Sequence, residues 1–205
     1  MTRQATYLMA FTSGALLHPA SLTLAQHYAE LGDWNAVKAG VLADNLLQVR
    51  TESAARRMFR EVASRLRELT PAEFDLLLEG SRPEQQHVLW LAVCKRYRFI
   101  HDFAVQVVRE KFLRLDLALT LDDYDVFFSD KAEWHPEVAG VAESTRRKQR
   151  QVVFAMLREA GLLSEEGRIL HAILTPRTVE AIAADDPAWL NIYPLFPAEI
   201  QEWLP

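Results

Sequence analysis

Residues 81–97 read SRPEQQHVLWLAVCKRY and decide the fold. Ser81 stands three residues before a glutamate, with a proline between them, which is the pattern of a capping box at a helix start. The VLWLAVC segment that follows is apolar on nearly every side of a helix, and a helix of that kind is buried all round. No glycine or proline occurs from there to Pro136. We therefore expect helix 84–97 at the centre of a helical molecule.

The rest of the chain is rich in helix signals and poor in strand signals. Thr70-Pro71-Ala72-Glu73 begins a helix that Gly80 ends, and the stretch without glycine or proline has room for another helix over 99–115. The other predicted starts are Asp33 for a helix toward Gln48, Thr51 or Ser53 for one to about Leu69, Thr120, Ser144 for one that ends before Gly161, Thr175 and Pro197. The only hairpin candidate is LLSEEGRIL at 162–170, with Glu166-Gly167 as its turn.

Composition favours a folded protein without disulfides. The chain has 205 residues, 50% of them hydrophobic and 25% charged, which is enough apolar material for a sizeable core. Its single cysteine, Cys94, lies in the central apolar helix and is predicted to be a buried thiol. The lack of a cysteine framework suits a reducing compartment.

The N-terminal segment raises the alternative of a cleaved signal peptide. No charged side chain occurs from Gln4 to Ala29, and the apolar run after Arg3 has the length of a signal-peptide core. Polar residues and a proline, among them Ser13 and Pro19, interrupt the run well short of a membrane span. We therefore expect a short buried segment that leads to a helix after Pro19.

The positive charge of this acidic chain is segregated. The formal net charge is -5, yet 17 of the 23 lysines and arginines fall in the three windows 50–67, 95–114 and 146–158. A local cationic patch matters more than net charge for binding an anionic partner. The six cations of the middle window share no clean arc, and we expect some of them to pair with nearby acids such as Asp102, Glu110 and the 122–125 acids.

The first window predicts an amphipathic helix with an arginine face. At about 100° per residue, four arginines fall within one arc, whereas apolar residues such as Phe59 and Val62 fall within another. An amphipathic segment and a short turn precede this helix, so residues 35–69 have the outline of a helix-turn-helix. The predicted phosphate-contacting residues of this face are Arg56, Arg57, Arg60 and Arg67.

The third window begins STRRKQRQVVFAMLREAG at residues 144–161 and predicts a second basic face. Cations are disfavoured at a helix N-terminus, so their clustering there makes better sense if a phosphate is the neighbour. Residues 120–161 form the second helix-turn-helix-like element, and the glutamates at the tip of the following hairpin exclude that hairpin as a DNA contact. The predicted contacts are Thr145, Arg146, Arg147, Lys148 and Arg150, with Gln149 and Gln151 as possible base readers.

Motifs for catalysis and metal binding are missing from the sequence. It contains no GxxxxGK[ST], GxGxxG, HExxH, CxxC or GxSxG, and its histidines lack metal-ligand spacing. His101 and Asp102 are adjacent and are expected to diverge on a helix. Asp123 is interpreted as a helix N-terminal acid and Trp134-His135-Pro136 as a structural corner, in preference to a metal site and a base-stacking site.

Several long blocks carry a family resemblance. They are EGSRPEQQHVLWLAVCKRYRFIHDFAVQVVREKFL (79–113), DDYDVFFSDKAEWHPEV (122–138), STRRKQRQVVFAMLREAGLL (144–163), FTSGALL (11–17) and LGDWNAV (31–37). Over nearly the whole chain they resemble the BREX phage-defence protein A (BrxA) family. The resemblance implies a small, all-helical, cytoplasmic and non-catalytic component of a bacterial bacteriophage-exclusion system. It also implies double-stranded DNA binding through helix-turn-helix elements, but it carries over no catalytic motif.

Taken together, the sequence predicts an all-α, compact helical body with two helix-turn-helix-like elements and at most one small hairpin near 162–170. Region 1–80 is expected to contain the first element, and region 81–205 the central helices and the second, packed as one globular unit. The predicted function is that of a monomeric accessory factor that binds double-stranded DNA mainly through phosphates. No cofactor, metal or membrane is expected. The alternative is an adaptor that docks acidic surfaces of other BREX proteins, and an enzyme is the weakest hypothesis.

Overall fold

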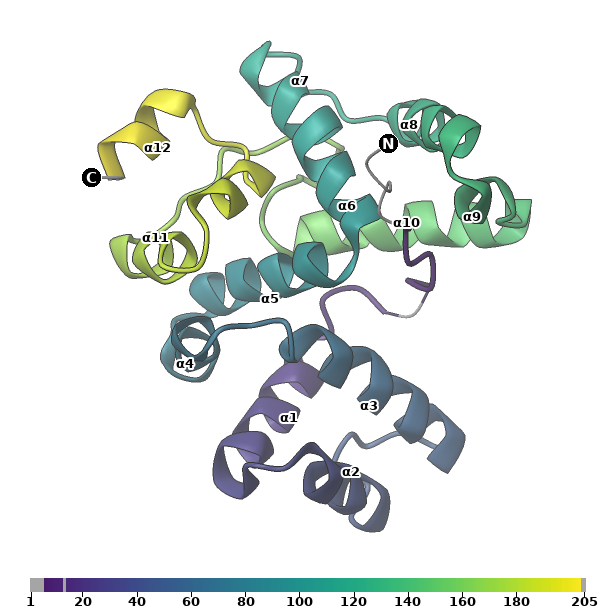
Figure 1. The fold of residues 1–205 in the computed structure, drawn as a ribbon, viewed down its shortest axis with the longest axis vertical. Coiled ribbons are helices and arrows are strands. Elements are labelled where there is room, and N and C mark those ends of the chain that lie inside the picture. The colour runs from purple at the N-terminus through teal and green to yellow at the C-terminus, as the bar shows by residue number, and fades with distance from the viewer. Residues whose placement is uncertain (1–5, 13, 204–205) are drawn as a thin grey trace.

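The computed structural model describes residues 6–12 and 14–203, and its regular elements there are helices (Figure 1). Arg3, Gln4 and Ser13, which entered the signal-peptide alternative, lie outside the described residues. The helices are α1 (His18–Leu31), α2 (Trp34–Ala43), α3 (Glu52–Leu66), α4 (Pro71–Glu79), α5 (Arg82–Arg96), α6 (Arg98–Phe103), α7 (Glu110–Leu113), α8 (Leu121–Trp134), α9 (Pro136–Ala139), α10 (Glu143–Glu159), α11 (Pro176–Ala183) and α12 (Pro197–Trp203).

Helix α5 lies in the middle of the molecule, as its apolar sequence predicts. It separates the group α1–α3 from the group α6–α10, with α11 and α12 to one side (Figure 1). Val88 to Cys94 are all buried, so Cys94 is the buried thiol that was expected. The indole N–H of Trp90 donates to the Ile192 carbonyl at 3.2 Å, which fastens the C-terminal part to α5. One hydrophobic cluster runs from Tyr7 to Leu195, and the division at residue 80 stays a prediction.

Helices α1, α2 and α3 pack against one another, and α3 also packs on α5. The caps match the sequence: Asp33 accepts from two N–H groups of α2, and the Thr51 hydroxyl accepts from the N–H of Ala54. The expected continuation of α2 to Gln48 is wrong, because Asn45 and Gln48 have φ of 47° and 50° and cannot continue a right-handed helix. The connection between α2 and α3 therefore spans residues 44–51, longer than the three or four residues of a tight helix-turn-helix.

The helix expected over 99–115 is present, but it is not α-helical along its whole length. A π-helical segment, Ala104–Arg109, lies between α6 and α7. Leu115, at φ 60°, follows the end of α7. The Thr120 hydroxyl and the Asp123 carboxylate then form the capping box that begins α8, which confirms the interpretation of Asp123 as a helix N-terminal acid.

The segment from α8 to residue 170 keeps the expected order of helix, connection, helix and hairpin. The connection contains the short helix α9 instead of a tight turn. The hairpin is reduced to one isolated bridge, Leu163 with Ile169, and Gly167 at φ 82° makes its turn. A separate bridge, Ala118 with Arg168, joins it to the segment before α8. Gly161, at φ 71°, follows α10 as predicted.

The segment before α1 is buried at regular intervals, as expected of a structural segment. Tyr7, Phe11 and Leu16 belong to the core. Arg65 donates to the Ala15 carbonyl at 2.8 Å, and the Leu16 N–H donates to Glu159 at 2.8 Å. Among the helices of residues 6–12 and 14–203, none combines the length and the hydropathy of a membrane span.

Candidate nucleic-acid interface

The arginine face of α3 exists as the helical wheel predicted. Arg56, Arg57, Arg60 and Arg67 are all exposed, whereas Phe59 is buried in the core on the other side of the helix. A fifth arginine of the window, Arg65, is only 3% exposed and is held at 2.7 Å by Glu61. It joins α3 to the core and adds nothing to the outer face.

The four exposed arginines differ in what they already contact. Arg56 forms an ion pair with Glu52, one turn earlier on the same helix. The Arg67 guanidinium lies over the Trp34 ring, 5.3 Å from its centroid. Arg57 and Arg60 form no ion pair with any residue in the described part of the chain. A guanidinium without a carboxylate partner is free to pair with phosphate oxygens, which it binds well.

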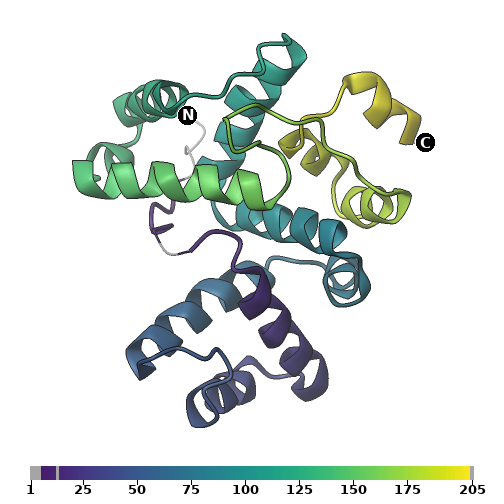
Figure 2. The ribbon, with the colours of Figure 1, turned by 180° about the vertical axis from the view of Figure 1, so that it is seen from behind.

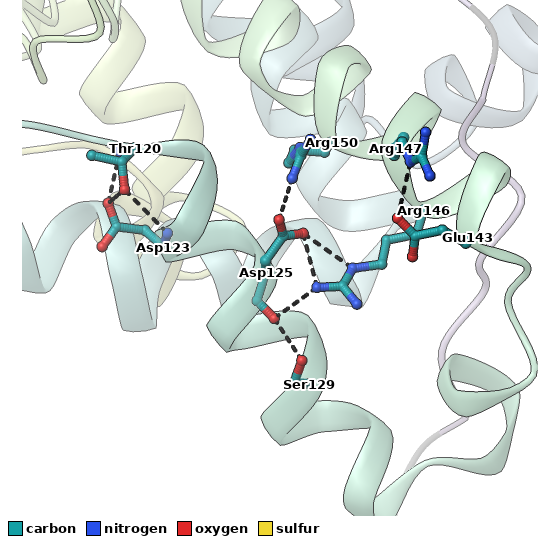
Figure 3. A network of polar contacts seen from close by, with 8 residues as sticks. All are labelled: Thr120, Asp123, Asp125, Ser129, Glu143, Arg146, Arg147 and Arg150. Carbon is teal, nitrogen blue, oxygen red and sulfur yellow. Dashed lines mark hydrogen bonds and ion pairs between the residues drawn. The ribbon is translucent and has the colours of Figure 1, made fainter.

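At the head of α10, a single carboxylate on α8 binds two of the predicted contacts (Figure 3). Arg146 Nε lies 3.0 Å from Asp125 Oδ1, and its guanidinium stacks 4.8 Å above the centroid of Phe128. Arg150 pairs with the other oxygen of Asp125. Two positive charges therefore share one negative charge. This pairing has no local sequence signal, because α8 and α10 are brought together only by the fold.

The other α10 contacts are more open. Arg147 pairs with Glu143 at 3.0 Å, but both side chains are more than half exposed, so the pair is weak and easily exchanged. Lys148 is exposed and makes no ion pair within residues 6–12 and 14–203. Thr145 is partly exposed in the first turn of the helix.

The start of α10 lacks a side-chain cap. Ser144 was expected to be the N-cap, but the helix begins at Glu143 and the N-cap is Ala142, whose methyl group cannot accept a hydrogen bond. The earlier start leaves first-turn backbone N–H groups without a side-chain acceptor. Such groups favour an anion, and Arg147 and Lys148 stand one turn further along.

Gln149 is excluded as a base reader. Its side chain is fully buried, and its amide donates to the Met9 carbonyl at 2.5 Å. The residue lies on the inner face of α10, where it holds the N-terminal segment. Gln151 is exposed and keeps its place as a candidate.

The middle window of cations is largely paired with acids, as expected: within the described residues, all of its members except Arg109 form an ion pair. Lys95 lies 2.7 Å from both Glu73 and Asp185 and is almost completely buried. The remaining pairs are Arg96–Glu68, Arg98–Asp102, Lys111–Asp116, Lys111–Asp123 and Arg114–Glu110. Arg98 and Arg114 stay 61% and 77% exposed despite their pairs, so these two cations are not withdrawn from the surface.

Two expectations about neighbouring polar residues are wrong. His101 and Asp102 do not diverge, because His101 Nδ1 lies 2.9 Å from Asp102 Oδ1. Trp134 is not part of a buried corner, because its side chain is 74% exposed; the buried His135, with its ring 4.3 Å from that of Tyr7, occupies the corner instead. Within the described residues, no three His, Cys, Asp or Glu side chains are grouped as a metal site.

The fold brings the two basic helices to the same side of the molecule. The N-terminal ends of α3 and α10 both point to the right in Figure 1 and to the left in the reverse view of Figure 2. The segment before α1 lies between them in both views, tied to α10 at Met9 and to α3 at Ala15. Its described residues, 6–12 and 14–17, carry no charged side chain, so none of them places a carboxylate between the two helices.

Fold and site together define an all-helical protein in which the N-terminal ends of α3 and α10 lie on one side, with Arg56, Arg57 and Arg60 on α3 near that end and Arg67 at the other end of the helix (Figure 1). The chain belongs to the BrxA family, whose model matches residues 5–186. It is 28% identical to the BREX protein BrxA of Bacillus cereus (strain H3081.97) over 63% of this chain and 65% of that relative. It is 25% identical to the BREX protein BrxA of Escherichia coli O9:H4 (strain HS) over 80% and 78% of the two chains.

A solved structure has the same fold. The crystal structure of an uncharacterized protein from Magnetospirillum magneticum matches with a TM-score of 0.79 at 20% identity. The match covers 92% of this chain and 98% of that one. The helical arrangement is therefore shared nearly from end to end.

Proposed function

We propose that the protein is a non-catalytic, cytoplasmic component of a BREX phage-defence system that binds double-stranded DNA mainly through the phosphate backbone. Membership of the BrxA family supports the cellular role. The observation that carries DNA binding is the pair of basic helix ends on one side of an acidic molecule. Charge gathered on one side can attract a polyanion even when the net charge is negative.

The chemistry of these side chains fits phosphates better than bases. Arg57, Arg60 and Lys148 are exposed cations without ion pairs in the described chain, and the first turn of α10 offers N–H groups nearby. Arginine, lysine and helix N-termini are the usual donors to phosphate oxygens and carry no sequence information themselves. With Gln149 buried, Gln151 is the one remaining base-reading candidate, so we expect little sequence preference.

The experiment is a fluorescence-anisotropy titration of a labelled random duplex of about 30 base pairs at about 50 and about 200 mM salt. We expect binding that weakens by orders of magnitude between the two concentrations. The variant Arg60→Glu with Lys148→Glu should lose binding. A matched control, Arg82→Glu with Arg177→Glu, changes the net charge equally on α5 and α11 and should bind like wild type. Equal loss in both variants would reject the assigned interface.

A second candidate function is a protein–protein adaptor. Arg146, Arg147 and Arg150 already pair with carboxylates of Asp125 and Glu143, so this surface also suits acidic side chains of other BREX proteins. Co-purification of the BREX components with the Arg60→Glu, Lys148→Glu variant separates the two functions. If assembly is lost while affinity for the duplex is intact, the adaptor is correct and DNA binding is incidental.

A further inference from the structure

A cavity lies between α6, α8 and the segment before α1, and the proposed interface does not use it. Its volume is about 340 Å³, at the small end for ligand pockets. On α8, the Asp125 side chain forms an ion pair with Arg146 of α10, whereas Lys131 and Trp134 line this cavity. The cavity is therefore separate from the basic face of α10.

The floor of the cavity is a fixed hydrogen-bond acceptor. The Asp102 carboxylate accepts from the Tyr7 hydroxyl at 2.6 Å and from His101 at 2.9 Å. Burial acts to raise the pKa of Asp102, but the hydrogen bonds from His101 and Tyr7 outweigh it and hold the pKa below its usual range. An ionised carboxylate has about four acceptor positions, so capacity is left for a donor in the cavity. The His135 ring, 4.3 Å from the Tyr7 ring, keeps this floor in place.

The other side chains that line the cavity differ in chemistry from the Asp102 carboxylate. The Trp134 side chain lines the cavity yet is 74% exposed, whereas Trp90 in the core is fully buried. The Arg98 side chain, 61% exposed, lies 3.8 Å from Asp102. Lys131 adds a second cation, held 2.8 Å from Gln106, and the neighbouring Asp130 adds a carboxylate to the lining. An exposed indole beside two cations and a buried acceptor is a combination that a flat, amino-bearing, phosphorylated ligand would satisfy.

We propose that this cavity holds one unpaired nucleobase of a nucleic acid, stacked on Trp134, with its amino group donating to Asp102 and its phosphate near Arg98 and Lys131. Indole stacks on any base, because every base has a π-face. The acceptor floor favours adenine, cytosine and guanine, since thymine has no exocyclic amino group. The cavity volume, about 340 Å³, has room for a base. The inference deepens the proposed DNA binding by naming a ligand that a fully paired duplex does not present.

The test compares three labelled DNAs: a paired duplex, the same duplex with one unpaired adenine, and its single strand. Replacing a stacking aromatic residue with alanine weakens binding about 5- to 150-fold. Trp134→Ala should show that loss for the bulged duplex, the single strand or both, and should bind the paired duplex like wild type. Val126→Ala, at a position 61% exposed on the same helix, is the control and should change nothing. Replacing the unpaired adenine with thymine should weaken wild-type binding.

Each outcome of this test either supports or contradicts the binding of an unpaired base in the cavity. A loss confined to the single strand identifies a strand end or gap as the source of the base, and a loss confined to the bulge identifies a base extruded from a duplex. If Trp134→Ala binds all three DNAs like wild type, or wild type binds neither unpaired form, the inference is wrong. Equal affinity for adenine and thymine bulges overturns the contact with Asp102. If wild type ignores the paired duplex but binds unpaired bases through Trp134, the proposed function fails and the cavity assignment stands.

Discussion

Asp125 controls how much charge α10 presents to a partner. Its two carboxylate oxygens bind Arg146 and Arg150, and the Arg146 guanidinium also donates to the Asp125 carbonyl at 3.2 Å (Figure 3). A phosphate that approaches this pair meets one net positive charge instead of two. The carboxylate thus competes with DNA for the same guanidinium groups.

Removal of that competition gives the first prediction. Asp125→Asn keeps the shape of the side chain and deletes its charge, so duplex affinity should rise several-fold and the log–log salt slope should steepen by about 1. Stability should fall by about 1 kcal/mol, because the partly exposed ion pairs of Asp125 with Arg146 and Arg150 are lost. Anisotropy and urea unfolding measure the two effects. Asp122→Asn makes the same charge change on α8 without that pair, and an equal gain there would attribute the effect to net charge alone.

His87 gives a second prediction at the residue scale. Its burial, opposed by the nearby Glu84 charge, lowers its pKa from 6.5 to about 4. Between those values the unfolded chain binds a proton that the folded chain does not, so stability is complete above pH 6.5 and is lost as pH falls toward 4. From pH 7.5 to 5.5, His87 should account for about 1 kcal/mol of lost stability. Urea unfolding of His87→Leu should lack that part of the loss and His27→Leu should retain it; the same pH dependence in both variants would contradict the assignment.

At the scale of elements, local signals predicted starts better than ends. The caps at Asp33, Thr51, Thr70 and Thr120 were confirmed because a side chain and a backbone N–H a few residues away are sufficient for a cap. The end of α2 was not predicted. Asn45 adopts a left-handed backbone conformation there, and glycine is the only residue type that reliably signals that conformation in a sequence.

The candidate site was predictable only in part, for a related reason. The exposure of the α3 arginines follows from one helix alone, and it was predicted correctly. The pairing of Asp125 with two arginines, the burial of Gln149 against Met9 and the exposure of Trp134 all depend on contacts between segments far apart in sequence. A helical wheel has no information about such contacts.

The cap of α3 gives a prediction for that element. The Thr51 hydroxyl accepts from the Ala54 N–H at 3.2 Å, immediately before the arginine face. Thr51→Ala should cost about 1 kcal/mol and lower the melting temperature by about 2–4 °C, measured by circular dichroism. Frayed first-turn residues should also weaken duplex binding slightly. Thr23→Ala, whose exposed hydroxyl bonds within α1, is the matched control. An unchanged melting temperature in Thr51→Ala would mean that solvent replaces the cap.

For the whole molecule, the arrangement of charge matters more than its sum. The N-terminal ends of α3 and α10 share one side, and residues 6–12 and 14–17, which carry no charged side chain, lie between them (Figure 2). Helices α4, α11 and α12 are away from that side, and α12 adds Glu199 and Glu202 with no cation. A polyanion should therefore approach from a single direction and contact α3 and α10 together. Two contacts on one duplex gain affinity because the second forms within the same complex.

This shared approach predicts the stoichiometry. Sedimentation velocity with excess labelled duplex of about 16 base pairs should give one duplex per 23.4-kDa chain, and the free chain should sediment as a monomer. Reversal of charge on α3 alone, with Arg57→Glu and Arg60→Glu, should keep one duplex per chain and weaken its binding, because α10 still holds the same molecule. Two duplexes per wild-type chain, falling to one in that variant, would instead mean that the helices bind separate DNAs, and the shared approach would be wrong.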